Sequence, residues 1–377
     1  MFPQLALTAA EIAAHFAAAT RASVRQTLAK PARDFFDLLT LISPAAQTIL
    51  PEITAAATLA RRRYFGKTVS LYAPLYVSNS CINGCRYCDF NAHNQQPRKI
   101  LTLDEIAREA DALRALGLDA VLIVAGENPH RCSTDYLAAV GKLLRPRFSS
   151  LSLEVAPQTE DGYRQLFAAG FDGLTLFQET YDRELYAELH PSGPKRDYDF
   201  RLGSQLRAGR AGMRVLGVAF LMGLTDWRLE AASLAAHAFY LQRECWRSKL
   251  QFAFPRLTPM GGGFTPPAPV SDEELELAMS AFRVVFPEAG MTVSTREPPT
   301  LRDRLVISCA DNMSAGSKVT PGGYATDARE EVGQFTLNDE RRVAEIAAAI
   351  RRHGQAPVRK NWDGAFAASP EAGGINN

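Results

Sequence analysis

The stretch TVSLYAPLYVSNSCINGCRYCDF, residues 68–90, joins a strand-like run to a loop that carries three cysteines. The run at 68–78 is rich in β-branched, aromatic and other apolar residues, a pattern that predicts a buried strand. Cys81, Cys85 and Cys88 follow the end of this run. They therefore lie in a loop at the C-terminal end of a strand, where proteins built from alternating strands and helices keep their chemistry.

Seven further runs of the same kind follow, and most of the segments between them carry helix signals. Thr102 with Glu105, and Ser271 with Glu274, are capping-box pairs that stand just ahead of apolar-periodic stretches. The eight predicted strands are 68–78, 120–127, 150–157, 173–180, 215–224, 249–257, 291–297 and 304–312.

Strands that alternate with helices pair in parallel, and eight such units over roughly 250 residues are typical of a (βα)8 barrel. A doubly wound parallel sheet is the alternative. Helical segments around 8–29 and 44–64, broken by Pro31 and Pro51, predict an N-terminal helical extension over residues 1–66. The barrel is expected over 67–320. Residues 321–377 are expected to pack on it as a C-terminal extension, with a helix within 335–354.

The composition describes an ordinary globular protein and excludes several classes of partner. Of 377 residues, 46% are hydrophobic and 22% charged, with a net charge of +1. That balance implies neither nucleic acid nor another polyelectrolyte as a partner. No apolar run approaches the ~18 residues of a membrane helix, and the amino terminus lacks the basic region of a signal peptide. Cys132, Cys245 and Cys309 are scattered singly, so a reducing cytoplasm is expected.

Three cysteines at this spacing have two inorganic interpretations. A structural zinc site takes four ligands, and His93, five residues beyond Cys88, could complete a Cys3His set. A [4Fe–4S] cluster usually takes four thiolates, so three local cysteines would leave one iron open to a small molecule. Spacing alone leaves both open.

The pattern CxxxCxxC, with Tyr87 before the last cysteine, resembles the signature of the radical S-adenosylmethionine superfamily. The resemblance implies a [4Fe–4S] cluster on Cys81, Cys85 and Cys88, whose open iron binds S-adenosylmethionine. It also implies that one-electron cleavage of that cofactor yields a 5′-deoxyadenosyl radical.

A second resemblance extends from about Ser43 to Asp363, well beyond the cysteine loop. The segments that carry it are SLYAPLYVSN (70–79), VAGE (124–127), LFQETY (176–181), YDFRL (198–202), GVAFLMGLTDWR (217–228), FPRLTP (254–259), STREP (294–298), NMSAGSKVTPGGY (312–324) and KNWD (360–363). With these segments the chain resembles the aromatic amino acid lyases of that superfamily, and most closely the tyrosine lyases of thiamine biosynthesis. This resemblance implies cleavage of the Cα–Cβ bond of L-tyrosine to dehydroglycine and p-cresol. It also implies a thiazole synthase partner and a flavodoxin- or ferredoxin-type electron donor.

Two related lyases match less well. The hydrogenase-maturation tyrosine lyase resembles HPSGPKRDYDFRL at 190–202, but that family needs a second cluster on C-terminal cysteines, and this sequence has none after Cys309. The tryptophan lyase shares the TRE segment and little of the tail. Sequence alone does not mark which aromatic ring is accepted.

By resemblance, residues at the strand ends bind S-adenosylmethionine. Gly126 permits close backbone approach, and Glu127 could accept from the methionyl amine or merely begin a helix. Arg201 suits the methionyl carboxylate, with a surface ion pair to Asp199 as the alternative. Tyr87 flanks the adenine or is a packing aromatic, and Asp89 stands where glycine is common in the family. The predicted cofactor-binding residues are Tyr87, Gly126, Glu127, Glu154, Gln178 and Arg201.

For the substrate, Arg296 at the end of the seventh run is the candidate partner of the amino-acid carboxylate. An unpaired charge in an apolar cavity is very costly, so such a partner is needed. An ion pair of Arg296 with Glu297 is disfavoured because neighbours on a strand face opposite ways. Tyr76 and Ser314 match family residues near the substrate amine, or are plain packing residues. Ser317 is expected to be a cap.

Overall fold

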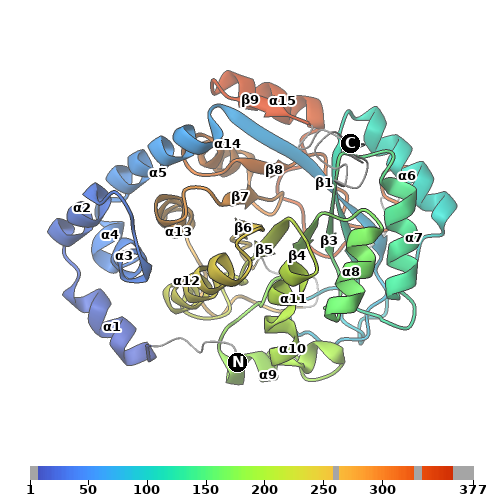
Figure 1. The fold of residues 1–377 in the computed structure, drawn as a ribbon, viewed down its shortest axis with the longest axis horizontal. Helices are drawn as coiled ribbons and strands as arrows, with labels where there is room; N and C mark the ends of the chain where they lie inside the picture. The colour runs from blue at the N-terminus through green and yellow to red at the C-terminus, as the bar shows by residue number, and fades with distance from the viewer. Residues whose placement is uncertain (1–6, 258–262, 327–332, 360–377) are drawn as a thin grey trace, which may run out of the picture.

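A computed structural model describes residues 7–257, 263–326 and 333–359. Its centre is a closed ring of eight parallel strands in the order β2-β3-β4-β5-β6-β7-β8-β1, in which β1 also pairs with β2 (Figure 1). The (βα)8 barrel is therefore confirmed and the doubly wound sheet is wrong. The strands are β1 (Thr68–Ser78), β2 (Ala120–Ala125), β3 (Ser150–Glu154), β4 (Gly173–Thr175), β5 (Val215–Val218), β6 (Lys249–Ala253), β7 (Gly290–Val293) and β8 (Asn312–Ser314).

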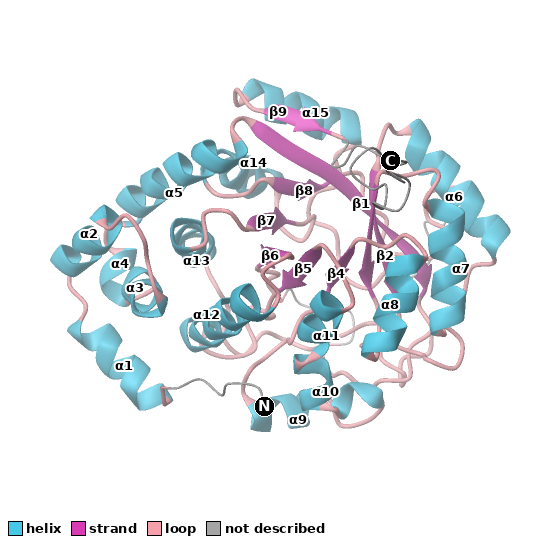
Figure 2. Ribbon diagram, viewed as in Figure 1, coloured by secondary structure: helices cyan, strands magenta, loops and turns pink. Residues whose placement is uncertain are grey.

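Helices surround the ring (Figure 2). The expected capping boxes begin two of them, Thr102 at α6 and Ser271 at α13. The helices of the barrel are α6 (Leu103–Ala115), α7 (Thr134–Leu144), α8 (Glu160–Ala168), α9 (Arg183–Leu189), α10 (Tyr198–Leu202), α11 (Ser204–Arg210), α12 (Trp227–Glu244), α13 (Asp272–Val285) and α14 (Pro299–Ser308), with a 3-10 turn η1 (Pro194–Arg196) before α10.

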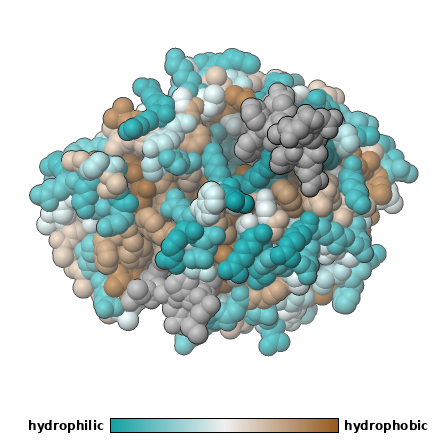
Figure 3. Space-filling model, in the orientation of Figure 1, coloured by the Kyte–Doolittle hydropathy of each residue, from teal (hydrophilic) through white to brown (hydrophobic). Residues whose placement is uncertain are grey.

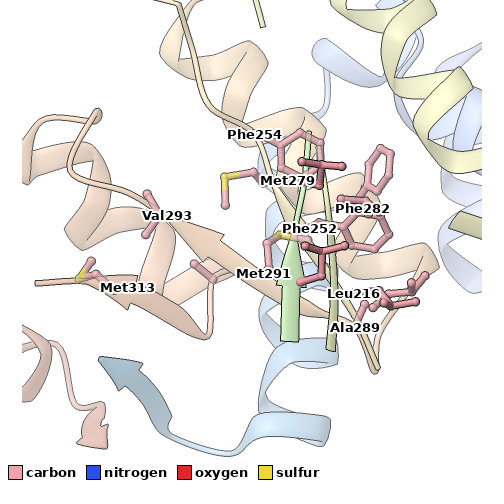
Figure 4. Close-up of a cluster of buried hydrophobic side chains, with 14 of the residues drawn as sticks. Leu216, Phe252, Phe254, Met279, Phe282, Ala289, Met291, Val293 and Met313 are labelled. Atoms are coloured by element: carbon pink, nitrogen blue, oxygen red, sulfur yellow. The ribbon is translucent and has the colours of Figure 1, made fainter. Parts of the chain in front are cut away.

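The hydrophobic core lies between the strands and their helices. Figure 4 shows part of it, where Phe252 of β6 and Met291 of β7 lie near Phe282 of α13. Phe252 and Phe282 are in aromatic contact, with ring centroids 5.0 Å apart. Because strand side chains alternate between faces, residues next to these, such as Gln251 and Thr292, face the interior of the ring and line its cavity.

The N-terminal extension is helical, as predicted, and wraps one side of the barrel (Figure 1). Its helices are α1 (Ala9–Ala18), α2 (Arg21–Ala29), α3 (Phe35–Leu41), α4 (Pro44–Gln47) and α5 (Leu50–Phe65). Pro51 does not break a helix but stands in the first turn of α5, where its missing N–H costs nothing. Buried Arg61 ties α5 to the barrel by donating to the carbonyls of Ala310 (2.7 Å) and Thr68 (2.9 Å).

The prediction of a strand at 304–312 is wrong. Residues up to Ser308 belong to α14, which begins at Pro299 and buries Leu301, Leu305 and Val306. The eighth strand is the short Asn312–Ser314, which pairs with β7 and β1. A strand from 304 would have left too few residues for the crossover that parallel strands require. Ser314 therefore ends β8 instead of lying after it.

Beyond the ring, α15 (Val343–Arg352) confirms the predicted C-terminal helix, and β9 (Ala356–Val358) adds a parallel strand outside β1. The matching segment at 360–363 lies outside the described residues. The division at residues 66 and 320 remains a prediction. No helix in the described part of the chain is long and apolar enough to cross a membrane. On the face of the molecule that Figure 3 shows, hydrophilic residues lie over the middle.

Candidate active site

The cysteine loop leaves β1 at the C-terminal face of the ring. Arg98 organises it, donating to the carbonyls of Asn79 (3.0 Å), Phe90 (2.9 Å) and Asn91 (2.6 Å). Asn91 in turn donates its side-chain amide to the carbonyl of Cys85 at 2.8 Å. The loop is thus held by side chains that would survive the loss of any one thiol.

The three thiols suit a cluster better than a single ion. Cys81, Cys85 and Cys88 form no disulfide and lie between two hydrophobic clusters, one around Cys85 and the other touching Cys81 and Cys88. A zinc ion with ~2.3 Å Zn–S bonds would draw its ligands around one point. No three His, Cys, Asp or Glu side chains among the described residues are placed to hold one metal ion. His93 is exposed, and the donor set fits separate irons, as in a [4Fe–4S] cluster.

Beside the loop lies a buried network of four charged side chains. Arg201 pairs with Glu127 at 2.6 Å and with Glu179 at 3.4 Å. Lys195 pairs with Glu179 at 2.7 Å, and Asn83 donates to Glu127 at 2.8 Å. Burial alone would raise the pKa of Glu127, but Arg201 and Lys195 outweigh it and hold that pKa below its ordinary value. Buried ion networks of this kind are weak devices for stability and cluster at functional sites.

Glu179 adopts a backbone conformation that side chains avoid. Its φ of 72° is the only positive value among the described non-glycine residues. Such a conformation costs about 1–3 kcal/mol and persists where the surroundings impose it. Here it delivers the carboxylate to Lys195 and Arg201. The strain thus marks Glu179 as a site residue.

The structure resolves two alternatives left open by the sequence. Arg201 is buried on Glu127 and Glu179, whereas Asp199 pairs with Arg183, so the proposed surface pair between Arg201 and Asp199 is wrong. Glu127 is likewise a buried network member and begins no helix.

Three further predicted cofactor residues, Gly126, Tyr87 and Gln178, are each constrained by their surroundings. A Cβ on Gly126 would lie 2.5 Å from the carbonyl oxygen of Ser80, so the close approach there needs glycine. Tyr87 is buried, with its hydroxyl 2.7 Å from Nε2 of His190. The Nε2 group of buried Gln178 has no partner among the described residues.

A cavity of about 150 Å³ opens inside the barrel. Barrel interiors are normally filled by bulky branched side chains, but small residues line this one on β3, β4 and β5, among them Ser152, Thr175 and Gly217. A Cβ on Gly217 would lie 2.6 Å from Oγ1 of Thr175. These small residues leave room for a ligand.

Arg296 lines this cavity, as predicted. Its guanidinium forms no ion pair with any described residue. Glu297 pairs with Arg256 instead, Nε to Oε1 at 3.1 Å. The ring of Phe335 stacks on the guanidinium, 3.7 Å from its carbon to the ring centroid, and Asn338 donates to the Arg296 carbonyl at 2.6 Å. A guanidinium stacked on one face keeps its edge free for a carboxylate.

The residues predicted near the substrate amine also line the cavity. Tyr76 donates its hydroxyl to Oε1 of Gln334 at 2.5 Å. The Ser314 hydroxyl accepts from the backbone N–H of Thr295 at 3.1 Å. Ser317 is not a cap, because its hydroxyl is buried without a partner among the described residues and faces the cavity.

Four site residues were not predicted. Lys195 and Glu179 belong to the charged network, and Gln334 and Phe335 cover the cavity. For Glu179 a signal existed, because it stands beside the predicted Gln178, but β4 ends at Thr175 and strand alternation no longer says which neighbour points inward. Gln334 is separated by 258 residues from Tyr76, with which it forms a hydrogen bond, and no local sequence pattern predicts that contact.

Glu154 lines the same cavity as Arg296 and forms no ion pair with a described residue. Burial raises the pKa of Glu154 to about 7, with Arg296 opposing the shift. The folded state then holds the proton more tightly than the unfolded state does. Ionisation of Glu154 therefore lowers the free energy of unfolding as the pH rises from about 4.5 to about 7. We expect Glu154→Gln to be more stable than the wild type at pH 8, and the gain to shrink at pH 6.

Thermal denaturation of the cluster-reconstituted protein at both pH values measures this effect. The matched control is Glu288→Gln, because Glu288 is exposed on the surface. An equal effect of Glu154→Gln at pH 8 and pH 6 would contradict the burial of an uncompensated carboxylate.

Comparisons with known proteins agree with this geometry. The family model described as the radical SAM superfamily matches residues 75–235, and that of the biotin and thiamin synthesis associated domain matches 253–356. The 2-iminoacetate synthase of Escherichia coli (strain K12) is 42% identical over 87% of each chain. The crystal structure of HydG, a maturase of the [FeFe]-hydrogenase, superposes with a TM-score of 0.88 at 30% identity, over 93% of this chain and 80% of that one. Methylornithine synthase (PylB) shares the fold at a TM-score of 0.72 and 21% identity, over 89% of this chain and 97% of that one.

The parallel barrel, the three free cysteines after its first strand and the family match over residues 75–235 together define a radical S-adenosylmethionine protein. Such proteins bind a [4Fe–4S] cluster and S-adenosylmethionine. Within that superfamily, the chain belongs to the 2-iminoacetate synthase family.

Proposed function

We propose that this protein cleaves the Cα–Cβ bond of L-tyrosine to 2-iminoacetate and p-cresol, with 5′-deoxyadenosine and methionine as further products, and so supplies the thiazole moiety of thiamine. The observation that carries the proposal is Arg296. Its guanidinium has no carboxylate partner among the described residues, and it stands at the mouth of a ring-sized cavity. The 42% identity to a 2-iminoacetate synthase supports the same activity.

Cys81, Cys85 and Cys88 would hold the cluster. When bound, the cluster and S-adenosylmethionine would supply a 5′-deoxyadenosyl radical for hydrogen-atom abstraction from the substrate amine. The chain's contribution is binding, orientation and exclusion of water. The hydrophobic clusters around the thiols serve the last of these.

The charged network is the proposed site of the methionyl group. Arg201 offers a guanidinium fork to the carboxylate, and Glu127 and Glu179 offer acceptors to the amine. Asn83 and Lys195 hold these carboxylates in place. Gly126 adjoins Glu127 at the methionyl amine, Tyr87 flanks the adenine, and Gln178 faces the ribose or the methionyl group.

Arg296 and Glu154 carry opposite charges and line one cavity without pairing to other described residues. A free amino acid carries the complementary pair of charges. In this proposal Arg296 binds its carboxylate, and Glu154 faces its ammonium together with Tyr76 and Ser314. Glu154 thereby moves from the cofactor side, where the sequence resemblance put it, to the substrate side.

The partners are proposed on family grounds. Dehydroglycine hydrolyses readily, so transfer to a thiazole synthase is expected. A flavodoxin- or ferredoxin-type donor would reduce the cluster. The six cysteines are all free in the structure, as suits the reducing cytoplasm.

The likeness to HydG makes one alternative worth testing, a hydrogenase-maturation lyase. That activity goes on to carbon monoxide and cyanide and needs a second cluster on C-terminal cysteines. The sequence has no cysteine after Cys309, and Cys309 is buried at the C-terminal end of α14. Soft thiolate ligands are what a second cluster would need.

We therefore expect about four irons per chain after anaerobic reconstitution, the content of one [4Fe–4S] cluster. Turnover of tyrosine labelled with ¹³C in its amino-acid carbons should give labelled glyoxylate, the hydrolysis product of 2-iminoacetate. Iron and sulfide assays and carbon NMR measure both. Labelled cyanide, or a reproducible second cluster, would favour the maturation activity instead.

A further inference from the structure

The barrel interior has a polar floor where a packed barrel would be apolar. Gln251 of β6, Thr292 of β7 and Asn312 of β8 line the cavity from three neighbouring strands. The register sets Thr292 beside Asn312, and Ala253, two residues after Gln251, beside Thr292. Their neighbours in sequence, such as Phe252 and Met291, point outward into the hydrophobic core (Figure 4).

Hydrogen bonds within this floor leave the Thr292 hydroxyl proton and the Asn312 side-chain oxygen without a partner among the described residues. The Thr292 hydroxyl oxygen accepts from the Gln251 amide at 2.5 Å and from the Asn312 amide at 3.1 Å. An oxygen that accepts twice has used both lone pairs, so the Thr292 hydroxyl proton points elsewhere. The carbonyl oxygen of the Asn312 side chain is buried and has no partner among the described residues.

A spare donor on Thr292 beside a spare acceptor on Asn312 is the complement of a hydroxyl group. A phenol can give its proton to the Asn312 oxygen and accept the proton of Thr292. An aliphatic or unsubstituted aromatic ring would leave both groups buried and unpaired, which is unfavourable.

The depth of the floor matches the length of a tyrosine side chain. Asn312 lies two residues before Ser314 on β8, a separation of about 6.6 Å along the strand. That is close to the reach of tyrosine from Cα to its hydroxyl. With the amino-acid end held at the level of Ser314 and Arg296, the hydroxyl falls at the level of Thr292 and Asn312.

The cavity is also of the right size for the ring. Its volume is about 150 Å³, and a cavity of that volume is known to admit benzene. The opposite wall is built from small residues, where glycine is required. A Cβ on Gly217, which lines that wall, would lie 2.6 Å from Oγ1 of Thr175. A six-membered ring therefore fits between this wall and the polar floor.

We propose that Thr292 and Asn312 bind the phenol hydroxyl of the substrate, with Gln251 orienting Thr292, and that this floor selects tyrosine against phenylalanine. The proposal rests on the proposed function, because it takes the amino-acid end of the substrate to lie at Arg296. It assigns the ring specificity that no sequence motif marks.

The test is binding without turnover, because loss of the hydroxyl alters the chemistry of cleavage as well as recognition. Reconstituted protein with S-adenosylmethionine but no reductant is titrated anaerobically with L-tyrosine and with L-phenylalanine in a calorimeter. We expect the wild type to bind tyrosine about ten- to a hundredfold more tightly, the effect of leaving two buried polar groups unpaired.

Thr292→Val and Asn312→Leu keep the side-chain shapes and remove the hydrogen-bonding groups. Each should lower the tyrosine-to-phenylalanine ratio of affinities, and the double variant should bring it below about threefold. Thr292→Ser restores the hydroxyl and should keep the wild-type ratio. Thr58→Val makes the same chemical change on α5, where the hydroxyl bonds only to the Thr54 carbonyl within the helix, and should change neither affinity.

Two results would overturn the proposal: a wild-type ratio near one, or a wild-type ratio retained by folded, cluster-loaded Thr292→Val or Asn312→Leu. Circular dichroism and iron content establish that each variant is folded and loaded. If the wild type bound neither amino acid, the proposed function itself would fail, and the polar floor would lose its substrate with it.

Discussion

Cys85→Ala should abolish both cluster binding and the formation of 5′-deoxyadenosine while the barrel stays folded. Cys85 lies in a loop, and that loop is held by Arg98 and Asn91 through backbone carbonyls, not through the thiol. The core between strands and helices does not depend on it. Removing the thiolate therefore removes a ligand of the cluster and little of the packing energy.

The measurements are visible absorbance and iron content after anaerobic reconstitution, 5′-deoxyadenosine by chromatography, and circular dichroism. Cys245→Ala is the matched control, because Cys245 is also buried but lies far along the chain at the end of α12. It should retain the cluster. Global unfolding of Cys85→Ala, or cofactor cleavage at the wild-type rate, would show that the cysteine loop is structural.

Arg296→Lys should keep the cluster but lower the use of tyrosine on the order of a hundredfold. Lysine retains the charge yet loses the planar fork that binds a carboxylate at two points, and it also loses the stacking of Phe335 on a flat guanidinium. Hydrogen abstraction from one N–H depends on the register of the substrate, and a misplacement of about 1 Å can cost ~10²-fold.

Cleavage of S-adenosylmethionine without p-cresol should become more prominent in this variant. The ratio of p-cresol to 5′-deoxyadenosine is therefore the measurement. Arg243→Lys controls for the chemical change, because Arg243 is exposed, pairs with its neighbour Glu244 and lies over the ring of Tyr240, away from the cavity. A wild-type ratio in Arg296→Lys would remove Arg296 from the substrate site and leave it a structural residue.

Much of the fold could be predicted because local sequence patterns indicate most of its strands. The run at 68–78 is long, apolar and β-branched, and β1 has those bounds. The eighth run failed because a short apolar stretch such as 304–309 fits a helix or a strand equally well. Only its surroundings decide, since α14 begins at Pro299 and the pairing partner of β1 is the chain from Asn312 onward.

The candidate site also combines residues that local sequence signals predict with residues that they do not. The spacing of the cysteines and the strand-end position of Arg296 are local signals. The structure places the cysteines in the loop after β1 and Arg296 at the cavity, as those signals predict. The contacts of Lys195 and Glu179 depend on a turn and on a single strained φ angle, which no propensity encodes. Gln334 and Phe335 reach the cavity from a distant segment. Such contacts exist only once the chain has folded.

The most direct test of the central claim is an anaerobic assay of the reconstituted protein with S-adenosylmethionine, a reductant, and tyrosine or tryptophan in parallel. Formation of p-cresol from tyrosine, in step with 5′-deoxyadenosine and without a corresponding product from tryptophan, is the predicted result. Absence of p-cresol from a protein that holds its cluster, or cleavage of tryptophan in preference to tyrosine, would contradict it.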